Sequence, residues 1–101
     1  MKYTHKYSKL DKKSYTTIRR YSKGKVGKGL IENYPGGQHG ATIMKIERKP
    51  LVQISTEFLL ADTDCENRQD AIDLIQSFYR TPINPYKDKL YIYYIRRSDH
   101  Y

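Results

Sequence analysis

One polar, strand-forming stretch constrains the fold of this chain more than any other. Residues Ser14–Tyr21 are rich in β-branched and aromatic side chains, which favour extended structure. Alternation along a strand places Tyr15, Thr17 and Arg19 on one face. The opposite face carries Ser14, Thr16, Ile18 and Arg20. Ile18 indicates that this second face meets the core, while the cations and hydroxyls predict that the strand also forms a wall of a polar cleft.

Further strands are predicted at residues 30–34, 40–49 and 90–96. Pro35-Gly36-Gly37 predicts a tight turn, because proline presets φ and glycine tolerates positive φ. Two alternation registers compete within residues 40–49. This competition predicts a strand that is buried on both sides or bent by a β-bulge, and Pro50 ends it.

Two helices are predicted in the second half of the chain. A short helix is expected within residues 51–60, with a start near Ser55. The clearest helix covers Asn67–Tyr79, where apolar residues recur at helical spacing. Acidic residues gather around its start and Arg80 follows its end, which suits the helix dipole. An acidic connector, residues 61–66, separates the two helices.

These elements predict a small α+β domain with two helices and five or six strands. No βαβ alternation is present, and a sheet built from so short a chain must protect its edges by curving or closing. We therefore expect a small β-barrel. The 101 residues are expected to form a single domain with its core in residues 12–96. Residues 1–10 are expected to be a first strand or a loose arm, and residues 97–101 a loose end.

The positive charge is concentrated at the start of the chain. Residues 1–29 carry a net charge of +9, with Asp11 as the single acid, whereas the whole chain carries +8. The ten cations of this segment are Lys2, Lys6, Lys9, Lys12, Lys13, Arg19, Arg20, Lys23, Lys25 and Lys28. A field this one-sided favours a polyanionic partner, and the predicted partner is RNA or a nucleotide. A solubility role or a basic arm is the alternative.

Several classes of protein are disfavoured by what the sequence lacks. No apolar run is long enough to cross a bilayer and no signal-peptide pattern is found, so no membrane partner is expected. Cys65 is the single cysteine and cannot form an internal disulfide, which makes a cytoplasmic setting the expectation. His5, His39 and His100 have no metal-ligand spacing with Cys65. No metal and no cofactor are predicted, and His39 is expected to be exposed.

The basic segment supplies the predicted nucleic-acid-binding residues. Phosphate contacts are expected from its lysines and arginines, and Tyr15 or Tyr21 could stack on a base. The full set is Lys12, Lys13, Tyr15, Arg19, Arg20, Tyr21, Lys23 and Lys25. The loop Gly24-Lys25-Val26-Gly27 has the spacing of the GXXG clamp in KH domains, but its flanks are strand-forming rather than helical, so a turn is expected instead.

The order of these elements resembles that of a known family. A polar strand ending Thr17-Ile18-Arg19 is followed by a basic loop, the strand Ala41–Arg48, the two helices and the strand Tyr91–Ile95. Taken together, the chain resembles the ASCH domain, a branch of the PUA-like β-barrel group. The resemblance implies a small PUA-like barrel with a cleft between the first polar strand and the acidic connector, and it implies RNA binding, to single-stranded or structured RNA.

The resemblance also implies two enzymatic alternatives. One ASCH branch is an amidohydrolase that removes the acetyl group of N4-acetylcytidine with a Lys, a Thr and a Glu, and some members cleave single-stranded RNA. Lys13 and Thr16 have the Lys-to-Thr spacing of that branch, whereas anchoring on Arg19 selects Thr17 instead. Asp64 takes the place of the glutamate. The candidate catalytic residues are therefore Lys13, Thr16, Thr17 and Asp64.

A non-catalytic role in protein interaction is the remaining alternative. Exposed, tyrosine-rich strand edges could pair with a partner, and a weak homodimer could form through the strand at residues 90–95. A monomer remains the other expected state.

Overall fold

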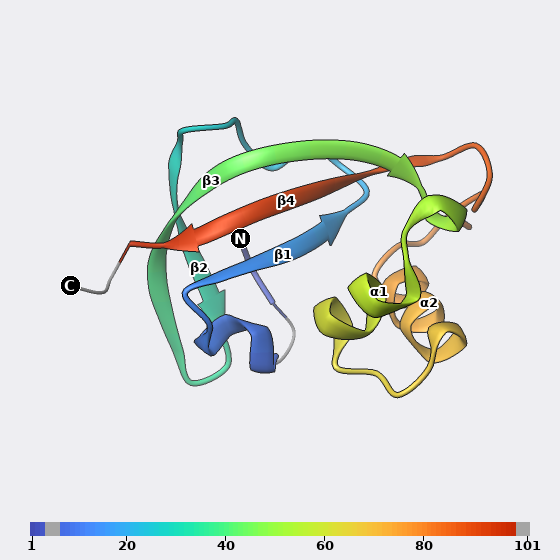
Figure 1. Cartoon of the computed structure of the whole chain (residues 1–101), viewed down its shortest axis with the longest axis horizontal. Coiled ribbons are helices and arrows are strands. Elements are labelled where there is room, and N and C mark those ends of the chain that lie inside the picture. Colours follow the sequence, from blue (N-terminus) through green and yellow to red (C-terminus); the bar gives the residue numbers. More distant parts are fainter. Residues whose placement is uncertain (4–6, 99–101) are drawn as a thin grey trace.

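The chain folds into a four-stranded antiparallel sheet with two α-helices (Figure 1). This computed structural model describes residues 1–3 and 7–98. The strands are β1 (Ser14–Arg19), β2 (Gly29–Tyr34), β3 (Gly37–Pro50) and β4 (Lys89–Arg97). The helices are α1 (Thr56–Thr63) and α2 (Arg68–Ser77), with short 3-10 helices η1 (Ser8–Asp11) and η2 (Leu51–Gln53). Within the described part of the chain, no helix has the length and apolar character needed to span a membrane.

The predicted turn and bulge both form where the sequence places them. Tyr34 pairs with Gly37 at the end of the β2–β3 hairpin, and Gly36 adopts a φ of 92°, which the flanking Pro35 and a missing Cβ allow. The register between β3 and β4 shifts at Met44, because Ile43 pairs with Ile95 while Lys45 pairs with Tyr94. The two competing alternation patterns of this strand therefore belong to the segments before and after a β-bulge.

Side-chain caps set the starts of both helices. The Ser55 hydroxyl accepts a hydrogen bond from the Phe58 amide at 3.2 Å, and the Asn67 side chain accepts one from the Asp70 amide at 2.9 Å. Each satisfies a donor that the first helical turn cannot pair internally. Asp64 ends α1 with a φ of 61°, a left-handed conformation that an aspartate tolerates better than most residues.

The sheet is ordered β1-β4-β3-β2 and is strongly curved, because one long strand serves two partners (Figure 1). The first part of β3 pairs with β2 through residues 37–42, and the later part pairs with β4 through residues 41–50. This curvature brings the two edge strands together through side chains: the Tyr15 hydroxyl on β1 donates to the Glu32 carboxylate on β2 at 2.9 Å.

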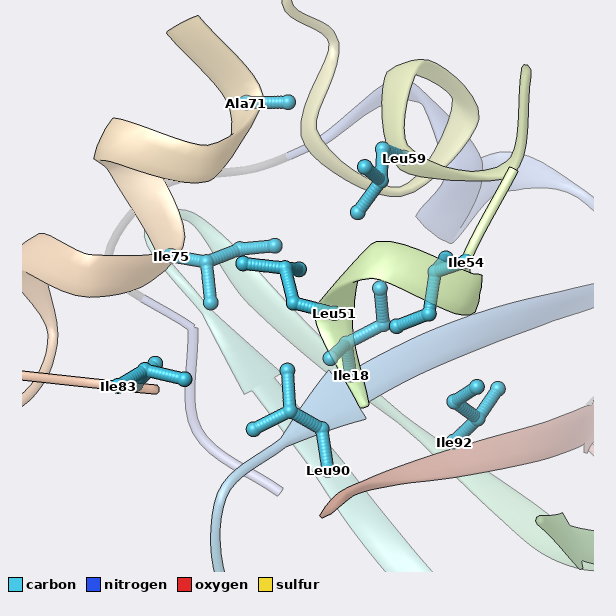
Figure 2. Close-up of a cluster of buried hydrophobic side chains, with 9 residues drawn as sticks. All are labelled: Ile18, Leu51, Ile54, Leu59, Ala71, Ile75, Ile83, Leu90 and Ile92. Carbon is cyan, nitrogen blue, oxygen red and sulfur yellow. The ribbon is translucent and has the colours of Figure 1, made fainter. Parts of the chain in front are cut away.

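The sheet separates two apolar cores. Figure 2 shows the first, where Ile18 and Leu90 from the sheet meet Leu59 of α1 and Ile75 of α2. The second lies inside the curve of the sheet and contains Tyr3, Tyr7, Leu10, Tyr15, Ala41, Ile43, Tyr93 and Ile95. Ile18 and Tyr15 thus face opposite cores, as the alternation along β1 predicts. Each face of the sheet therefore contributes to one of the two cores.

Two predictions about the strands are corrected by this arrangement. The sheet has four strands in the described residues rather than five or six, and β1 and β2 are its unjoined edges. One bent strand, β3, pairs with both β2 and β4, where two separate strands would otherwise be needed. A dimer through β4 does not fit either, because β4 is hydrogen-bonded to β1 on one side and β3 on the other.

The described residues at the start of the chain are held against the sheet and are not a loose arm. Residues 1–3 run along the outer edge of β2, where the Tyr3 amide donates to the Asn33 carbonyl at 2.8 Å and the Asn33 amide donates to the Met1 carbonyl at 2.7 Å. Tyr7 and Leu10 are buried in the second core. The predicted core of residues 12–96 therefore omits an essential part of the interior. At the other end, Arg97 still pairs with Ala41.

Candidate functional site

A buried ion pair lies beside β1, at the junction of the sheet, η1 and α1. The Lys9 ammonium is 2.6 Å from Asp62 Oδ1, and the two side chains are only 5% and 6% exposed. Lys9 Nζ also donates to the Thr16 carbonyl at 2.8 Å and lies 3.4 Å from the Thr17 hydroxyl. A lysine, a threonine and a carboxylate thus converge, in a set different from the predicted one.

The same pair satisfies the outer edge of β1. As an edge strand, β1 has backbone groups that no neighbouring strand can pair. Lys9 caps the carbonyl of Thr16, while the Asp62 carboxylate accepts a hydrogen bond from the backbone of Ile18. The ion pair therefore replaces the strand that would otherwise continue the sheet.

Burial shifts both members of the pair toward their neutral forms. Desolvation lowers the pKa of the Lys9 ammonium, and the attraction of Asp62 offsets only part of this shift. Desolvation likewise raises the pKa of the Asp62 carboxyl against the stabilising effect of Lys9. A lysine of lowered pKa next to a hydroxyl has the chemistry of a general base, and a carboxyl of raised pKa has that of a proton donor.

A second buried group, Glu32 of β2, is contacted by two hydroxyl groups and one amino group. Tyr3 and Tyr15 both donate to Oε1 at 2.9 Å, and the Met1 amino group lies 2.8 Å from Oε2. Glu32 is completely buried. A buried carboxylate is tolerated only when it is paired and hydrogen-bonded, so these contacts fix its position.

The donors around Glu32 determine the direction of the adjoining hydrogen bonds. Because the Tyr3 proton is used on Glu32, the Tyr3 oxygen must accept the proton of Thr17, 2.8 Å away. The Thr17 lone pairs are then left facing Lys9. By the same reasoning the Tyr15 oxygen accepts from His39 Nε2 at 2.7 Å, and Tyr34 lies 3.2 Å from the other ring nitrogen.

A pocket of about 440 Å3 opens next to this cluster. Its walls come from the first residues of the chain, from β1 and the loop after it, and from the end of α2. The lining residues are Lys2, Tyr3, Tyr7, Arg19, Lys23, Ser77, Phe78 and Tyr79. Three of these are cations, four are aromatic, and none is acidic. Arg19 is held in place by the face of Tyr3, 4.9 Å from the ring centre.

The structure separates the predicted catalytic residues. Lys13 is exposed, and its carbonyl accepts a hydrogen bond from the Arg97 amide. Asp64 binds the backbone amide and hydroxyl of Ser8 at 2.7 and 2.5 Å. Thr16 lies on the outer face of β1 and contributes its carbonyl, not its hydroxyl, to Lys9. Of the predicted set, Thr17 alone reaches the cluster, and Lys9 and Asp62 occupy the other two roles.

The predicted nucleic-acid-binding residues are also divided. Arg19 and Lys23 line the 440 Å3 pocket, while Lys12 lines a separate cleft of about 260 Å3 beside Phe58. Tyr15 is 7% exposed with its hydroxyl engaged, so its predicted stacking on a base is wrong. Arg20 is occupied in holding the loop after α2, with bonds to Thr81 and Pro82. The remaining three, Lys13, Tyr21 and Lys25, are exposed.

Several residues of the cluster are not identified from the sequence, among them Asp62, which lies in the predicted acidic connector. Lys9 belongs to a segment that reads as a loose arm, although the spacing of Tyr3, Tyr7 and Leu10 marks one apolar side of it. Glu32 looks like an ordinary charged residue of an edge strand. His39 was expected to be exposed but is 4% exposed, because the hairpin turns its ring toward Tyr15 and Tyr34.

Over residues 1–3 and 7–98, no group of three or more His, Cys, Asp or Glu side chains is arranged to hold a metal ion. His5 and His100 lie outside the described residues.

Comparison with known proteins places the chain beside one relative. No family model and no solved structure matches it. The uncharacterized protein MJ0364 of Methanocaldococcus jannaschii is 32% identical over an alignment 105 positions long, which covers 94% of this chain and 92% of that protein. The chain belongs to the same family as this protein. Because the similarity spans nearly all of both chains, the relationship concerns the whole fold and not a single motif.

The Lys9–Asp62 pair makes a specific prediction about stability. Lys9→Met should cost about 3–5 kcal/mol of the free energy of unfolding, because it leaves the Asp62 carboxylate buried without its partner. Adding Asp62→Leu should restore part of the loss, since it removes the unpaired carboxylate, although the backbone groups of Thr16 and Ile18 stay without these partners. Urea denaturation of the single and double variants measures both effects. A double variant as unstable as Lys9→Met would contradict this account.

The tyrosines around Glu32 predict a loss of stability in alkali. Burial first, and then the charge of Glu32, raise the pKa values of Tyr3 and Tyr15 above the ordinary value of 10. The stabilising contribution of their neutral forms is therefore complete below pH 10 and is lost as pH rises above it, where the unfolded chain ionises first. Urea denaturation at a series of pH values between pH 8 and pH 11 should show this decline in the free energy of unfolding. Tyr3→Phe/Tyr15→Phe should flatten it, and an equally steep decline in that variant would contradict the assignment.

Proposed function

We propose that this protein is an RNA-binding domain of the ASCH type within the PUA-like group. The observation that carries the proposal is the pocket beside β1, which combines Lys2, Arg19 and Lys23 with aromatic walls. Cations that contact phosphate and aromatic rings that contact bases are the two components of single-stranded RNA recognition. The +9 charge of residues 1–29 supplies the long-range attraction for such a ligand.

Two features support the ASCH resemblance at the level of the fold. The curved sheet brings its edges together at Glu32 and Tyr15, which approaches the barrel of the PUA-like group. Thr17-Ile18-Arg19, the motif on which the resemblance rests, places Thr17 and Arg19 on the inner side of this curve. The family pattern implies a lysine and an acid near this threonine, and here Lys9 lies 3.4 Å from the Thr17 hydroxyl and is itself paired with Asp62.

RNA binding should be strongly salt-dependent and should require Arg19. Titrating a labelled single-stranded RNA at 50 and 200 mM salt should show a marked loss of affinity, because each phosphate contact releases counterions. Arg19→Gln should weaken binding at both salt concentrations and reduce the slope by about one contact. Lys45→Gln, which removes an exposed charge outside the pocket, is the matched control. Binding that ignores salt, or an unaffected Arg19→Gln, would reject the proposal.

Amide hydrolysis of an N4-acetylcytidine-like nucleoside is the second candidate function. The specific observation in its favour is the convergence of Lys9, Thr17 and Asp62. A lysine whose pKa is lowered by burial can accept a proton, and a threonine hydroxyl can attack an acyl group once it is activated. Arg19 lies on the same face of β1 and could stabilise the developing oxyanion.

The burial of these groups favours binding over catalysis as the proposed function. Thr17 is completely buried and Lys9 is 4% exposed. Tyr3 covers the Thr17 hydroxyl and accepts a hydrogen bond from it. The hydroxyl hydrogen therefore points away from the lysine that would remove it. A substrate would have to displace Tyr3 before chemistry could begin, whereas the pocket at Arg19 is open in the folded protein.

The catalytic candidate has a direct test. If it is correct, incubation with N4-acetylcytidine should release cytidine, and Thr17→Val should abolish the release because the hydroxyl is lost while the shape is nearly kept. Tyr3→Phe should change the pH dependence of the rate, because the Thr17 hydroxyl loses the Tyr3 oxygen that accepts its hydrogen bond and links it to Glu32. No cytidine from the parent protein, or equal release from Thr17→Val, would eliminate this function.

A further inference from the structure

We propose that the 440 Å3 pocket accepts a single nucleotide unit, held by its phosphate on Lys2, Arg19 and Lys23 and by its base on Phe78. This inference rests on the proposed RNA-binding function and names the chemical class that this site recognises. A nucleoside monophosphate and the phosphorylated end of an RNA chain share that chemistry.

The charges of the lining residues require an anionic ligand. Three cations meet at the pocket, and none of the described residues that line it carries a carboxylate. The nearest buried acids are already neutralised, since Asp62 is paired with Lys9 and Glu32 with the Met1 amino group. A ligand phosphate would therefore face uncompensated positive charge. Charge-assisted hydrogen bonds from lysine and arginine are the strongest that a phosphate can accept.

Arg19 is arranged for this role before any ligand binds. Its guanidinium lies over the Tyr3 ring and donates to the carbonyls of Ile18 at 3.1 Å and Lys2 at 3.3 Å. A side chain held by three contacts loses little conformational freedom on binding. Lys2 and Lys23 remain exposed at the rim, where they can close onto the phosphate.

The aromatic walls identify one ring for the base. Tyr3 and Tyr7 are buried, and the Lys9 ammonium lies 5.5 Å from the centre of each ring. Tyr79 is packed edge-on against Tyr21 and accepts the Arg20 amide on its hydroxyl. Phe78 is different because it is 40% exposed at the end of α2. It is thus the lining ring with a free surface on which a base can stack.

The size of the pocket limits the ligand to one nucleotide. A volume of about 440 Å3 lies within the range of small-molecule sites, whereas a strand of several nucleotides needs an extended groove. Ser77, the last residue of α2, also lines the pocket, and the final carbonyls of a helix remain as acceptors. Such acceptors suit the exocyclic amino group of a base or a ribose hydroxyl.

Calorimetric titration with defined probes tests the inference. The probes are the four ribonucleoside 5′-monophosphates, the matching nucleosides and inorganic phosphate. We expect at least one monophosphate to bind, with its nucleoside and inorganic phosphate each bound at least tenfold more weakly. Lys23→Gln should weaken the monophosphate by roughly tenfold or more, the loss of one charge-assisted bond. Phe78→Ala should weaken the monophosphate by roughly fivefold or more and leave phosphate unchanged.

Controls and outcomes separate this inference from the proposed function. Lys45→Gln and Tyr86→Ala remove an exposed charge and an exposed ring outside the pocket, and both should bind within twofold of the parent. Lys23 and Phe78 are exposed, so their variants are expected to fold, which thermal melting checks. RNA binding without binding of any monophosphate would overturn the single-nucleotide site alone. Absence of both would overturn the proposed function as well, and equal affinity for nucleoside and monophosphate would overturn the phosphate assignment.

Comparing 5′-phosphorylated with 5′-hydroxyl RNA distinguishes the two sources of the ligand. A preference for the phosphorylated chain that Lys23→Gln removes would assign the site to RNA ends. Equal affinity for the two chains, together with binding of free monophosphates, would assign it to the free nucleotide.

Discussion

The ion pair between Lys9 and Asp62 is the interaction on which the rest of this structure depends. It closes the exposed edge of β1, it anchors η1 against the sheet, and it attaches α1 to the same point. Removing two charges from water is costly, and replacing such a pair by apolar residues is often neutral or stabilising. What the pair provides here is satisfaction of the polar backbone of an edge strand, which an apolar pair would leave unbonded.

Glu32 performs the corresponding task across the open side of the sheet. β1 and β2 are separated by two strands in the sheet order, and yet Tyr15 and Tyr3 connect both to one carboxylate. The curve of β3 makes this meeting possible, and the hydrogen bonds hold the curve in place. A four-stranded sheet can thereby enclose a second core without a strand that joins its edges. Polar contacts inside the curve replace the backbone pairing of a closed barrel.

Local chemistry explains which parts of this fold could be predicted. Pro35 and Gly36 specify their turn, Ser55 and Asn67 specify their helix starts, and the alternation along β1 assigns Ile18 and Tyr15 to opposite cores, because each signal acts within a few residues. Lys9 and Asp62 are 53 positions apart, and each, taken alone, is typical of a solvated charge. No local pattern reports that they meet.

The same limit applies to the site. Thr17 and Arg19 were accessible to prediction because a strand fixes which side chains share a face. Their partners come from η1, β2 and the end of α2. The polar side chains of β1 could therefore be predicted from the sequence, whereas the residues that face them could not. The assignment of Lys13 and Asp64 followed spacing along the chain. In the fold, Lys9 and Asp62 meet instead, because the burial of Leu10 in one core and of Leu59 in the other places their segments against the sheet.

Tyr3 links the open pocket to the buried cluster. Its ring supports Arg19, where a phosphate would bind, and its hydroxyl covers Thr17, where chemistry would occur. Moving Tyr3 would therefore expose Thr17 and at the same time remove a donor from Glu32 and the platform beneath Arg19. A buried carboxylate deprived of a donor is expensive, so the resting protein keeps Tyr3 in place. The arrangement favours a ligand that rests on the outer face of Tyr3, and any ligand that reaches Thr17 must first replace the hydrogen bonds that Tyr3 provides.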